Sequence, residues 1–338
     1  MCSNEQIRIG GNIMCTSITY TTKNHYFGRN FDYEISYGEQ VVVTPRNYVF
    51  EFRKEAPLKN HYAIIGIATV VNNYPLYYDA TNEKGLSIAG LNFAGLADYK
   101  PYVEGKDNIT PFELIPWLLG RCANVSEARN LLARINLVKI NFSPELPLAD
   151  LHWMMSDQQE SIVIECVKDG LKIYDNPIGV LTNNPQFEQQ VFQLNNYRSL
   201  STKTPVDTFA KGLNLDVYSR GMGGLGLPGD LSSSSRFIKA TFTKWNSVSG
   251  ESEAESVGQF FHILGSVEQQ MGLCDVGNEK YEHTIYSSCC NMDTGVFYYR
   301  SYHNSQITGV DMHKENLDGA TLACYPLINE QQFNIVNA

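Results

Sequence analysis

The sequence lacks the features that mark membrane proteins and nucleic-acid-binding proteins. No apolar run in its 338 residues approaches the roughly 18 residues that a spanning helix needs. Its 26 Lys and Arg residues are outnumbered by 36 Asp and Glu residues, which gives a formal net charge of −10. Because phosphate backbones and anionic lipid surfaces attract basic faces, we expect neither nucleic acid nor a membrane as a partner.

The sequence also lacks the common metal and cofactor motifs. Its 8 cysteines include no C-x-x-C pair, and its 7 histidines include no H-E-x-x-H motif, so we expect no zinc site and no disulfide framework. Residues 221–226 fit the pattern G-x-G-x-x-G, but no apolar strand precedes them and Pro228 follows where a helix should begin. There is no G-x-S-x-G elbow. We therefore expect neither a metal nor a cofactor, and we interpret His152 as a hydrogen-bonded core residue.

The remaining composition is that of a globular domain, with 43% hydrophobic and 18% charged residues. Residues 1–13 have neither the basic start nor the apolar centre of a signal peptide, so we expect a cytoplasmic protein. No low-complexity linker or repeat marks a domain boundary. We predict a leader over residues 1–14, absent from the active form, and a single domain over residues 15–338.

Runs rich in Val, Ile, Thr, Tyr and Phe predict antiparallel strands, and longer amphipathic runs predict helices between them. The strands are expected at 15–21, 26–31, 40–45, 61–71, 76–80, 86–92, 151–157, 161–167, 171–174, 283–290, 295–302 and 306–312. The helices are expected at 110–122, 126–135, 187–197, 234–248 and 253–265. This order indicates an α+β domain in which helices cover stacked antiparallel sheets.

Cys15, at the start of the first predicted strand, is the candidate nucleophile. If the bond between Met14 and Cys15 is cut, one residue carries both a thiol and a free α-amine. The ordinary pKa of an α-amine, about 7.7–8.0, suits a general base near neutral pH. This is the chemical logic of an amidase that uses its first residue as the nucleophile.

Four polar residues are candidate partners of Cys15. Arg29 and Asp32 lie on the next predicted strand, which a hairpin would fold back beside the first. Arg29 would favour the thiolate and Asp32 would orient the α-ammonium, although a surface ion pair explains the same spacing equally well. Asn92 and Asn183 sit where extended runs end, where they would either donate to an oxyanion or satisfy their own turns.

With these residues in place, the sequence resembles the choloylglycine hydrolase family of N-terminal-nucleophile hydrolases, and within it the bacterial bile salt hydrolases. The similarity extends over residues 14–330, nearly the whole chain. The similar segments are 14–20, 26–33, 44–47, 82–93, 151–153, 179–185, 226–230 and 235–237.

The resemblance implies a four-layer αββα fold, with two stacked antiparallel sheets between helical layers, and a homotetramer. It implies hydrolysis of the amide bond of glycine- or taurine-conjugated bile salts through a thioester intermediate. The catalytic residues that it implies are Cys15, Arg29, Asp32, Asn92, Asn183 and Arg236. Relatives that prefer a penicillin tend to carry Tyr at the position of Asn92, which favours bile salts as substrates.

The resemblance also implies substrate-binding residues. The apolar side chains that would hold the steroid are Phe31, Tyr37, Val71, Phe142 and Leu146, each of which would otherwise be explained as ordinary core. Ser219, Arg220 and Gly221 align with a loop thought to sense the amino-acid part. Because a guanidinium offers several donors to a sulfonate, this loop indicates a preference for taurine.

One departure from the family pattern concerns the residues before Met14. Relatives usually begin at Met-Cys, whereas 13 residues precede Met14 here. There are three explanations: a wrongly assigned start, a self-cleaved propeptide, or an N-terminal extension that is retained. We favour the first two, because an acylated nitrogen cannot act as a base. Cys2 also follows a Met, but no Arg and Asp pair follows it at the right spacing.

Two other kinds of function remain open from the sequence. A related amidase would act on penicillin V or N-acyl homoserine lactones, or would transfer the acyl group to another amine. A binding protein without turnover would result if the leader were retained and blocked the site.

Overall fold

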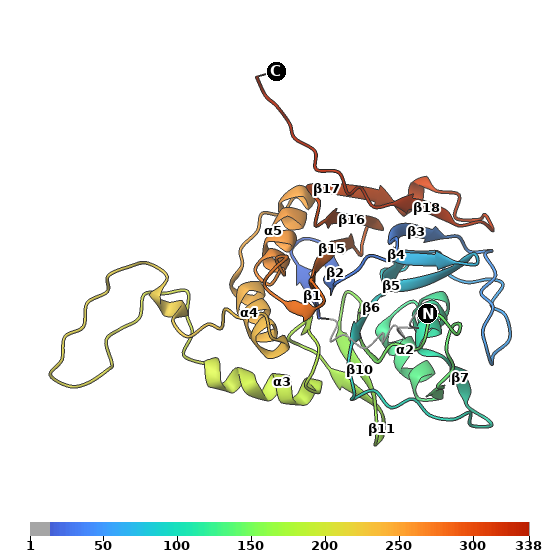
Figure 1. Cartoon of the computed structure of the whole chain (residues 1–338), viewed down its shortest axis with the longest axis horizontal. Coiled ribbons are helices and arrows are strands. Elements are labelled where there is room, and N and C mark those ends of the chain that lie inside the picture. Colours follow the sequence, from blue (N-terminus) through green and yellow to red (C-terminus); the bar gives the residue numbers. More distant parts are fainter. Residues whose placement is uncertain (1–13, 338) are drawn as a thin grey trace, which may run out of the picture.

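Two antiparallel sheets form the centre of the computed structural model, which describes residues 14–337 (Figure 1). The six-stranded sheet has the order β12 (Val180–Leu181), β1 (Cys15–Thr21), β2 (His25–Tyr33), β15 (His283–Asn291), β16 (Val296–Ser301) and β17 (Asn304–Asp311). The eight-stranded sheet has the order β11 (Gly170–Asp175), β10 (Ser161–Val167), β9 (Leu151–Ser156), β6 (Ser87–Asn92), β5 (Tyr74–Asn82), β4 (Ile64–Val71), β3 (Gln40–Thr44) and β18 (Ala323–Pro326).

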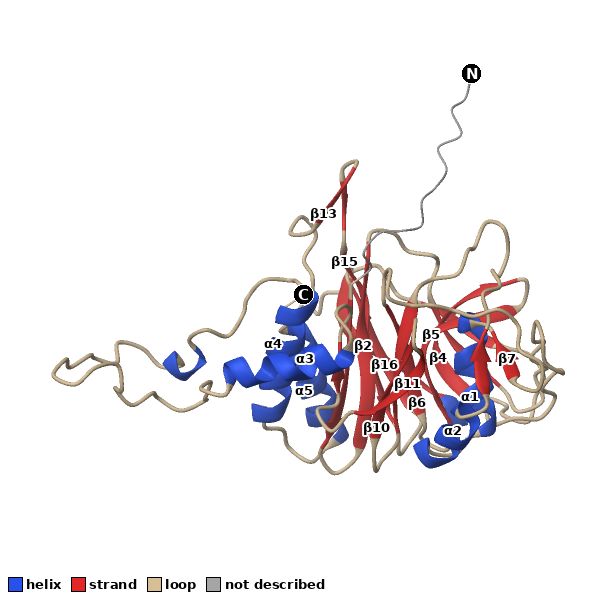
Figure 2. Ribbon diagram, turned by 90° about the horizontal axis from the view of Figure 1, so that it is seen from below, coloured by secondary structure: helices blue, strands red, loops and turns tan. Residues whose placement is uncertain are grey.

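Helices cover the outer face of each sheet, so the molecule has four layers (Figure 2). The helix α1 (Leu114–Arg121) packs on β5 and β6, and α2 (Val125–Leu132) lies beside it. On the other side, α4 (Ser233–Asn246) packs on β1, and α5 (Glu253–Gly265) packs on β15 and β2. A third helix, α3 (Phe187–Gln193), contacts α4 through the rings of Phe187 and Phe237. The predicted α+β class and αββα layering are confirmed.

Local sequence explains these elements. The strand β3 has three successive valines and β4 is largely Ile, Val and Ala, which suit strands buried on both faces. The N-cap of α5 is Ser252, whose side chain accepts from the backbone N–H of Glu255 while the side chain of Glu255 accepts from the backbone N–H of Ser252. Apolar side chains fill two cores, one around the six-stranded sheet and its helices and one between the eight-stranded sheet and α1 with α2.

The predicted elements all occur, with differences at their ends. The segment predicted as a helix over 110–122 begins as a 3-10 turn (Pro111–Glu113) before α1, and the one predicted over 187–197 ends as a 3-10 turn (Leu194–Tyr197) after α3. Six short strands were not predicted from the sequence: β7 (Asp107–Ile109), β8 (Ile135–Leu137), β12, β13 (Asp275–Gly277), β14 (Lys280–Tyr281) and β18. These have two to four residues each, too few to show a period.

His152 is a hydrogen-bonded core residue, as predicted. It is fully buried, and its ring nitrogens contact Oε1 of Glu165 at 3.1 Å and the carbonyl of Thr182 at 2.8 Å. The seven cysteines of the described region are free thiols, and most are buried.

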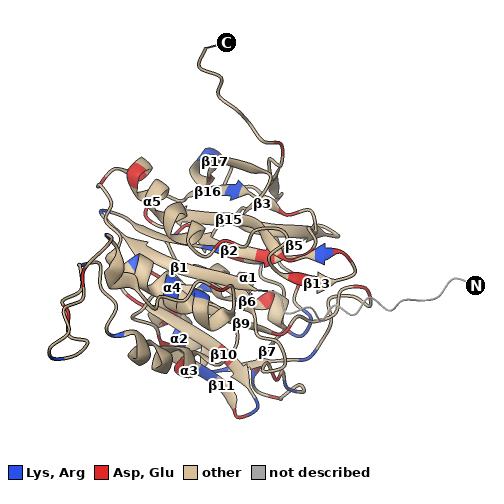
Figure 3. Cartoon of the chain, turned by 60° about the vertical axis from the view of Figure 1, so that its left-hand side comes forward, with Lys and Arg blue, Asp and Glu red and all other residues tan. Residues whose placement is uncertain are grey.

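A long loop over residues 198–232, which we call the arm, projects away from the layers (Figure 1). It contains the 3-10 turn Met222–Gly224 and exposes several large apolar side chains: Val206, Phe209, Leu213, Leu215, Val217, Tyr218 and Leu225. Figure 3 shows Lys and Arg residues distributed among Asp and Glu residues over several elements. Within residues 14–337, no helix combines the length and apolar character needed to cross a membrane.

Candidate active site

Cys15 lies at the first position of β1 and lines a cavity whose other walls come from β2, the eight-stranded sheet, the start of α1 and the segment 142–149. Its side chain is 1% exposed, and the volume of this cavity is about 390 Å³. In the hairpin of β1 and β2, Cys15 pairs with Phe31, so both side chains are on the same face. The backbone N–H of Cys15 donates to Oδ1 of Asn183 at 2.7 Å. The nitrogen that processing would free is therefore already held by a side chain from a distant segment.

Arg29 is fully buried in β2, on the face that Cys15 shares. Its guanidinium donates to the backbone carbonyls of Asn30, Tyr78 and Gly90, and its Cζ lies 5.1 Å from the ring centroid of Phe31. Its Nη2 has no hydrogen-bond partner among the described residues. Arg29 lines the cavity beside Cys15 and retains a free donor.

Asp32 is also fully buried, one residue beyond Phe31. Its carboxylate accepts from the hydroxyl of Thr284 at 2.6 Å and from Nε2 of Gln269 at 3.3 Å. Burial raises the pKa of Asp32 to about 6, against the lowering effects of Arg236, Thr284 and Arg29. The alternative of a surface ion pair between Arg29 and Asp32 is wrong, because β15 and the eight-stranded sheet cover this part of β2.

Arg236 reaches the start of β1 from the first turns of α4. It is 1% exposed, and its Nη1 donates to the carbonyl of Cys15 at 2.6 Å. Its Nη2 donates to Oδ1 of Asn183 at 2.7 Å, and its Nη1 lies 4.0 Å from the carboxylate of Asp32. Burial lowers the pKa of Arg236, and the charges of Asp32 and Cys15 oppose that effect. This guanidinium connects three of the predicted catalytic residues.

Asn92 and Asn183 are brought together by the two sheets. Nδ2 of Asn183 donates to the backbone carbonyl of Asn92 at 2.8 Å. The side chain of Asn92, at the end of β6, lines the cavity and makes no hydrogen bond within the described residues. Asn183 therefore orients the nitrogen of Cys15, and Asn92 presents an amide to the cavity.

Burial dominates the ionisation of the thiol. It raises the pKa of Cys15, whereas the positive charges of Arg29 and Arg236 and a backbone hydrogen bond from Asp32 lower it. The negative charge of Asp32 opposes thiolate formation. An α-ammonium on Cys15 would add a further positive charge at bonding range, which favours the thiolate.

The cavity beyond Cys15 is walled mainly by aromatic and aliphatic side chains. All five residues predicted to hold the steroid line it: Phe31, Tyr37, Val71, Phe142 and Leu146. Further lining residues were not predicted from the sequence, among them Tyr78, Phe112, Ile115 and Leu148. Such residues carry no signal in the sequence because an apolar side chain on a cavity wall has the same pattern as a core residue.

The predicted amino-acid-sensing residues lie elsewhere in this chain. Ser219, Arg220 and Gly221 are exposed residues of the arm and do not line the cavity of Cys15. The turn at Gly221, with φ of +81°, uses the conformational freedom of glycine.

Met14, the residue before Cys15, is held by two backbone hydrogen bonds. The carbonyl of Met14 accepts from the backbone of Asp32 at 3.1 Å, and the N–H of Met14 donates to the carboxylate of Glu282. Burial raises the pKa of Glu282 to about 8, with the charge of Asp32 acting in the same direction. Together with the bond from Cys15 to Asn183, these contacts fix the Met14–Cys15 peptide on both sides.

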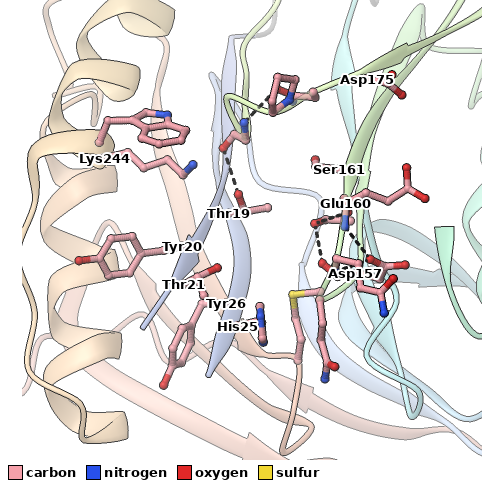
Figure 4. Close-up of a pocket in the computed structure, with 18 of the residues that line it drawn as sticks. Thr19, Tyr20, Thr21, His25, Tyr26, Asp157, Glu160, Ser161, Asp175 and Lys244 are labelled. Atoms are coloured by element: carbon pink, nitrogen blue, oxygen red, sulfur yellow. Dashed lines mark hydrogen bonds between the residues drawn. The ribbon is translucent and has the colours of Figure 1, made fainter. Parts of the chain in front are cut away.

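A larger cavity, of about 790 Å³, lies at the opposite end of β1 (Figure 4). Thr19, Thr21, His25, Asp157 and Lys244 are among its lining residues. Lys244 donates to the carbonyl of Ile178 at 2.6 Å, and burial lowers its pKa to about 8. The lining contains neither a cysteine nor the predicted catalytic residues, so the smaller cavity is the candidate active site.

Residues 15–325 match the family of linear amide C–N hydrolases, choloylglycine hydrolase family. The chain is 65% identical to a bile salt hydrolase/transferase of Lactiplantibacillus plantarum, over 96% of this chain and 100% of that protein. It is 37% identical to a bile salt hydrolase/transferase of Clostridium perfringens over the same shares of the two chains.

The solved structures give the same picture of the fold. A mutant conjugated bile acid hydrolase of Clostridium perfringens superposes with a TM-score of 0.89 at 37% identity, covering 96% of this chain and 100% of that one. A penicillin V acylase of Agrobacterium tumefaciens has a TM-score of 0.73 at 19% identity, covering 92% and 90% of the two chains. The second likeness shows the fold alone.

Proposed function

The chain belongs to the choloylglycine hydrolase family of linear amide C–N hydrolases, and on that premise we propose that it hydrolyses the amide bond of glycine- or taurine-conjugated bile salts. The observation that carries this proposal is the position of Cys15 in the lining of an apolar cavity, with its nitrogen held by Asn183. A thiol there reaches the amide carbonyl of a substrate whose steroid fills the cavity.

The reaction proceeds in two steps. The thiolate of Cys15 attacks the carbonyl carbon, and the α-amine passes the thiol proton to the leaving amine as the C–N bond breaks. Glycine or taurine departs, and the bile acid remains as a thioester on Sγ. Water, deprotonated by the α-amine, then breaks the C–S bond and regenerates the thiol.

Each neighbouring residue has a role that follows from its contacts. Arg29, with its free Nη2, stabilises the thiolate, and Asn92 donates to the developing oxyanion from the cavity wall. Asn183 and Arg236 hold the α-amine and the carbonyl of Cys15, respectively. Asp32, beside Arg236, balances the positive charges at the site.

The active form is proposed to begin at Cys15, with residues 1–14 absent as a removed leader or a wrongly assigned start. In the described chain the nitrogen of Cys15 is an amide that donates to Asn183, and an amide nitrogen has no lone pair available for a proton. The base in the mechanism therefore exists only after the Met14–Cys15 bond is broken.

The arm supports association with further copies of the chain, as the predicted homotetramer requires, because large apolar side chains exposed on one projecting segment are expected to be covered in an assembly. Arg220 lies outside the cavity of its own chain, so a role in selecting taurine requires that the arm contact a second copy. The homotetramer and the cytoplasmic location remain predictions.

Acyl transfer is a second candidate activity. The relatives from Lactiplantibacillus plantarum and Clostridium perfringens are both named hydrolase/transferase. An amine that enters the cavity in place of water would attack the thioester and form a new amide while releasing the thiol. Incubation with cholate conjugates and a different free amino acid, followed by mass spectrometry, would detect that amide.

Intact-mass analysis combined with hydrolysis assays tests the main proposal. We expect a mature chain that starts at Cys15, cleaves taurocholate and glycocholate faster than penicillin V, and loses this activity in the Cys15→Ala variant. Full activity in a chain that keeps residues 1–14, or in Cys15→Ala, would overturn the proposal. A stable full-length chain that binds bile salts without turnover would favour the binding protein instead.

A further inference from the structure

A second buried carboxylate, Asp79, lies behind Arg29 on β5. It is 1% exposed, and the mechanism above does not use it. Its Oδ1 accepts from the hydroxyl of Tyr286 and its Oδ2 accepts from the hydroxyl of Ser288, each at 2.7 Å. Both donors lie on β15, so Asp79 joins the two sheets across the interior of the molecule.

Ser288 connects this carboxylate to Arg29. Its oxygen donates to Asp79 and accepts from the backbone N–H of Arg29 at 3.2 Å. The guanidinium of Arg29 forms no ion pair with a carboxylate among the described residues, since its hydrogen bonds go to backbone carbonyls. A buried cation without a paired anion is costly, so nearby negative charge is needed to hold it.

Four groups supply negative charge to Arg29 when they ionise. Burial lowers the pKa of Arg29, but Cys15, Tyr286, Asp79 and Asp32 raise it above its ordinary value. Burial raises the pKa of Asp79, and Arg29 is the first group that lowers it. The carboxylate of Asp32 already has Arg236 as a cationic neighbour. For Asp79, Arg29 is the one cation among the described residues that lowers the pKa of the carboxyl group.

Tyr286 extends the same network to the cavity wall. Its ring stacks on that of Phe31 with centroids 5.2 Å apart, and Phe31 lines the cavity beside Cys15. The bond from Tyr286 to Asp79 therefore fixes one aromatic wall as well as the strand that carries Arg29.

We propose that Asp79 is a positioning residue that holds Arg29 and Phe31 in place and tunes the ionisation of the Cys15 thiol through the charge of Arg29. This inference rests on the proposed role of Cys15 as the nucleophile. The charged groups that face Cys15 are Arg29 and Asp32 from β2 and Arg236 from α4, and Asp79 acts behind Arg29 from β5.

The test compares the purified enzyme with its Asp79→Asn variant. Asparagine keeps the shape but removes the charge, so the guanidinium has one counter-charge fewer and attracts the thiolate more strongly. We expect the acid limb of the kcat/KM profile to move down by about one pH unit, because neighbouring charges shift pKa values by about that much. The pH dependence of Cys15 alkylation by iodoacetamide, read by peptide mass spectrometry, should move equally.

Two further variants control for structural damage. Tyr286→Phe keeps the ring and removes one donor to Asp79, so the pKa of Asp79 rises and the profile should shift part of the way in the same direction. Glu113→Gln removes another buried carboxylate, which caps the helical turn before α1, and should leave the acid limb unchanged.

Unchanged alkylation profiles in both Asp79→Asn and Tyr286→Phe would overturn the inference, as would a shift to higher pH. If Asp79→Asn does not fold, Tyr286→Phe alone decides. Alkylation reports on the ionisation of the thiol without requiring turnover, so it tests the role of Asp79 separately from the proposed function. The proposed function is tested by Cys15→Ala, and an active Cys15→Ala enzyme would refute it.

Discussion

The backbone nitrogen of Cys15 lies 2.7 Å from Oδ1 of Asn183, although the two residues are 168 positions apart in the chain. The same oxygen accepts from Nη2 of Arg236. An oxygen that binds a guanidinium cannot rotate freely, so the nitrogen of Cys15 is held in one orientation. The base of the proposed reaction is therefore positioned by the fold before any substrate binds.

Replacing Asn183 by Ala should leave the α-amine free to rotate. We expect kcat to fall about 100-fold, the size of effect that misplacing a reacting group produces, with a smaller change in KM. Steady-state kinetics with taurocholate measure both. Asn184→Ala is the matched control, since its side chain donates to the carbonyl of Ala94 instead. Equal losses in the two variants would contradict the assigned role of Asn183.

In the chain that retains Met14, the ionised carboxylate of Asp32 lowers the free energy of unfolding. Its pKa rises from 3.8 to about 6 on folding, so the folded state binds the proton more tightly between these values. The free energy of unfolding should therefore fall as the pH rises from about 4 to about 6, and it should stay lower above pH 6.

Asp32→Asn should prevent that fall in the free energy of unfolding. Gln269 has an unpaired Oε1, and turning its amide would let it accept from the new side chain. We expect the free energy of unfolding at pH 8 to increase by up to about 3 kcal/mol, with little change at pH 4, while hydrolysis is lost. Urea denaturation at both pH values measures this. A variant that is less stable than the parent chain at pH 8 would refute the argument.

The longer strands and helices could be predicted from the sequence, because their composition and periodicity are local properties, and Cys15 could be proposed as the nucleophile because the chemistry of a terminal thiol is local too. It did not distinguish a buried Arg29 and Asp32 from a surface ion pair, since that depends on β15, which lies about 250 residues later in the chain. Arg236 entered only through the family resemblance. Asp79 and Tyr286 had no signal, because an isolated Asp or Tyr acquires a role only when another strand supplies its partner.

Arg53 should affect steroid binding from outside the cavity. Its Cζ lies 5.2 Å and 5.6 Å from the ring centroids of Phe142 and Phe112, and its Nη2 donates to the carbonyl of Phe142. A cation–π contact at an exposed site contributes about 0.5–1 kcal/mol, so Arg53→Ala should raise KM for bile salts roughly two- to fivefold at unchanged kcat. Arg121→Ala, which removes a guanidinium stacked on Trp117, is the control and should leave KM unaltered.

Arg220 should influence selectivity only within an assembly. We expect Arg220→Ala to lower the ratio of taurocholate to glycocholate hydrolysis severalfold, because a charge-assisted bond to the sulfonate is lost. Changing Phe209 and Val206 to Ser should weaken the oligomer and lower the same ratio, which light scattering and paired assays would follow together. An unchanged ratio in Arg220→Ala would remove this residue from the binding site.

Gly28, on the strand that carries Arg29, and Gly258, in α5, provide opposite tests of packing. A Cβ at Gly28 would lie 2.0 Å from the carbonyl oxygen of Ser288, where β2 and β15 meet, whereas one at Gly258 in α5 meets nothing within 4 Å. Gly28→Ala must push the strands apart and should cost about 3 kcal/mol or more. Gly258→Ala should stabilise the protein by about 0.5–1 kcal/mol through helix propensity.

The two alanine variants also separate stability from activity. Because Ser288 accepts from the backbone of Arg29, Gly28→Ala displaces the guanidinium as it moves β15 and should lower kcat even at temperatures where the protein stays folded. Gly258→Ala touches no residue of the site and should keep kcat unchanged. Thermal melting curves and kinetics on the same samples decide the matter: a Gly28→Ala enzyme with normal kcat would show that the contact between β2 and β15 does not position Arg29.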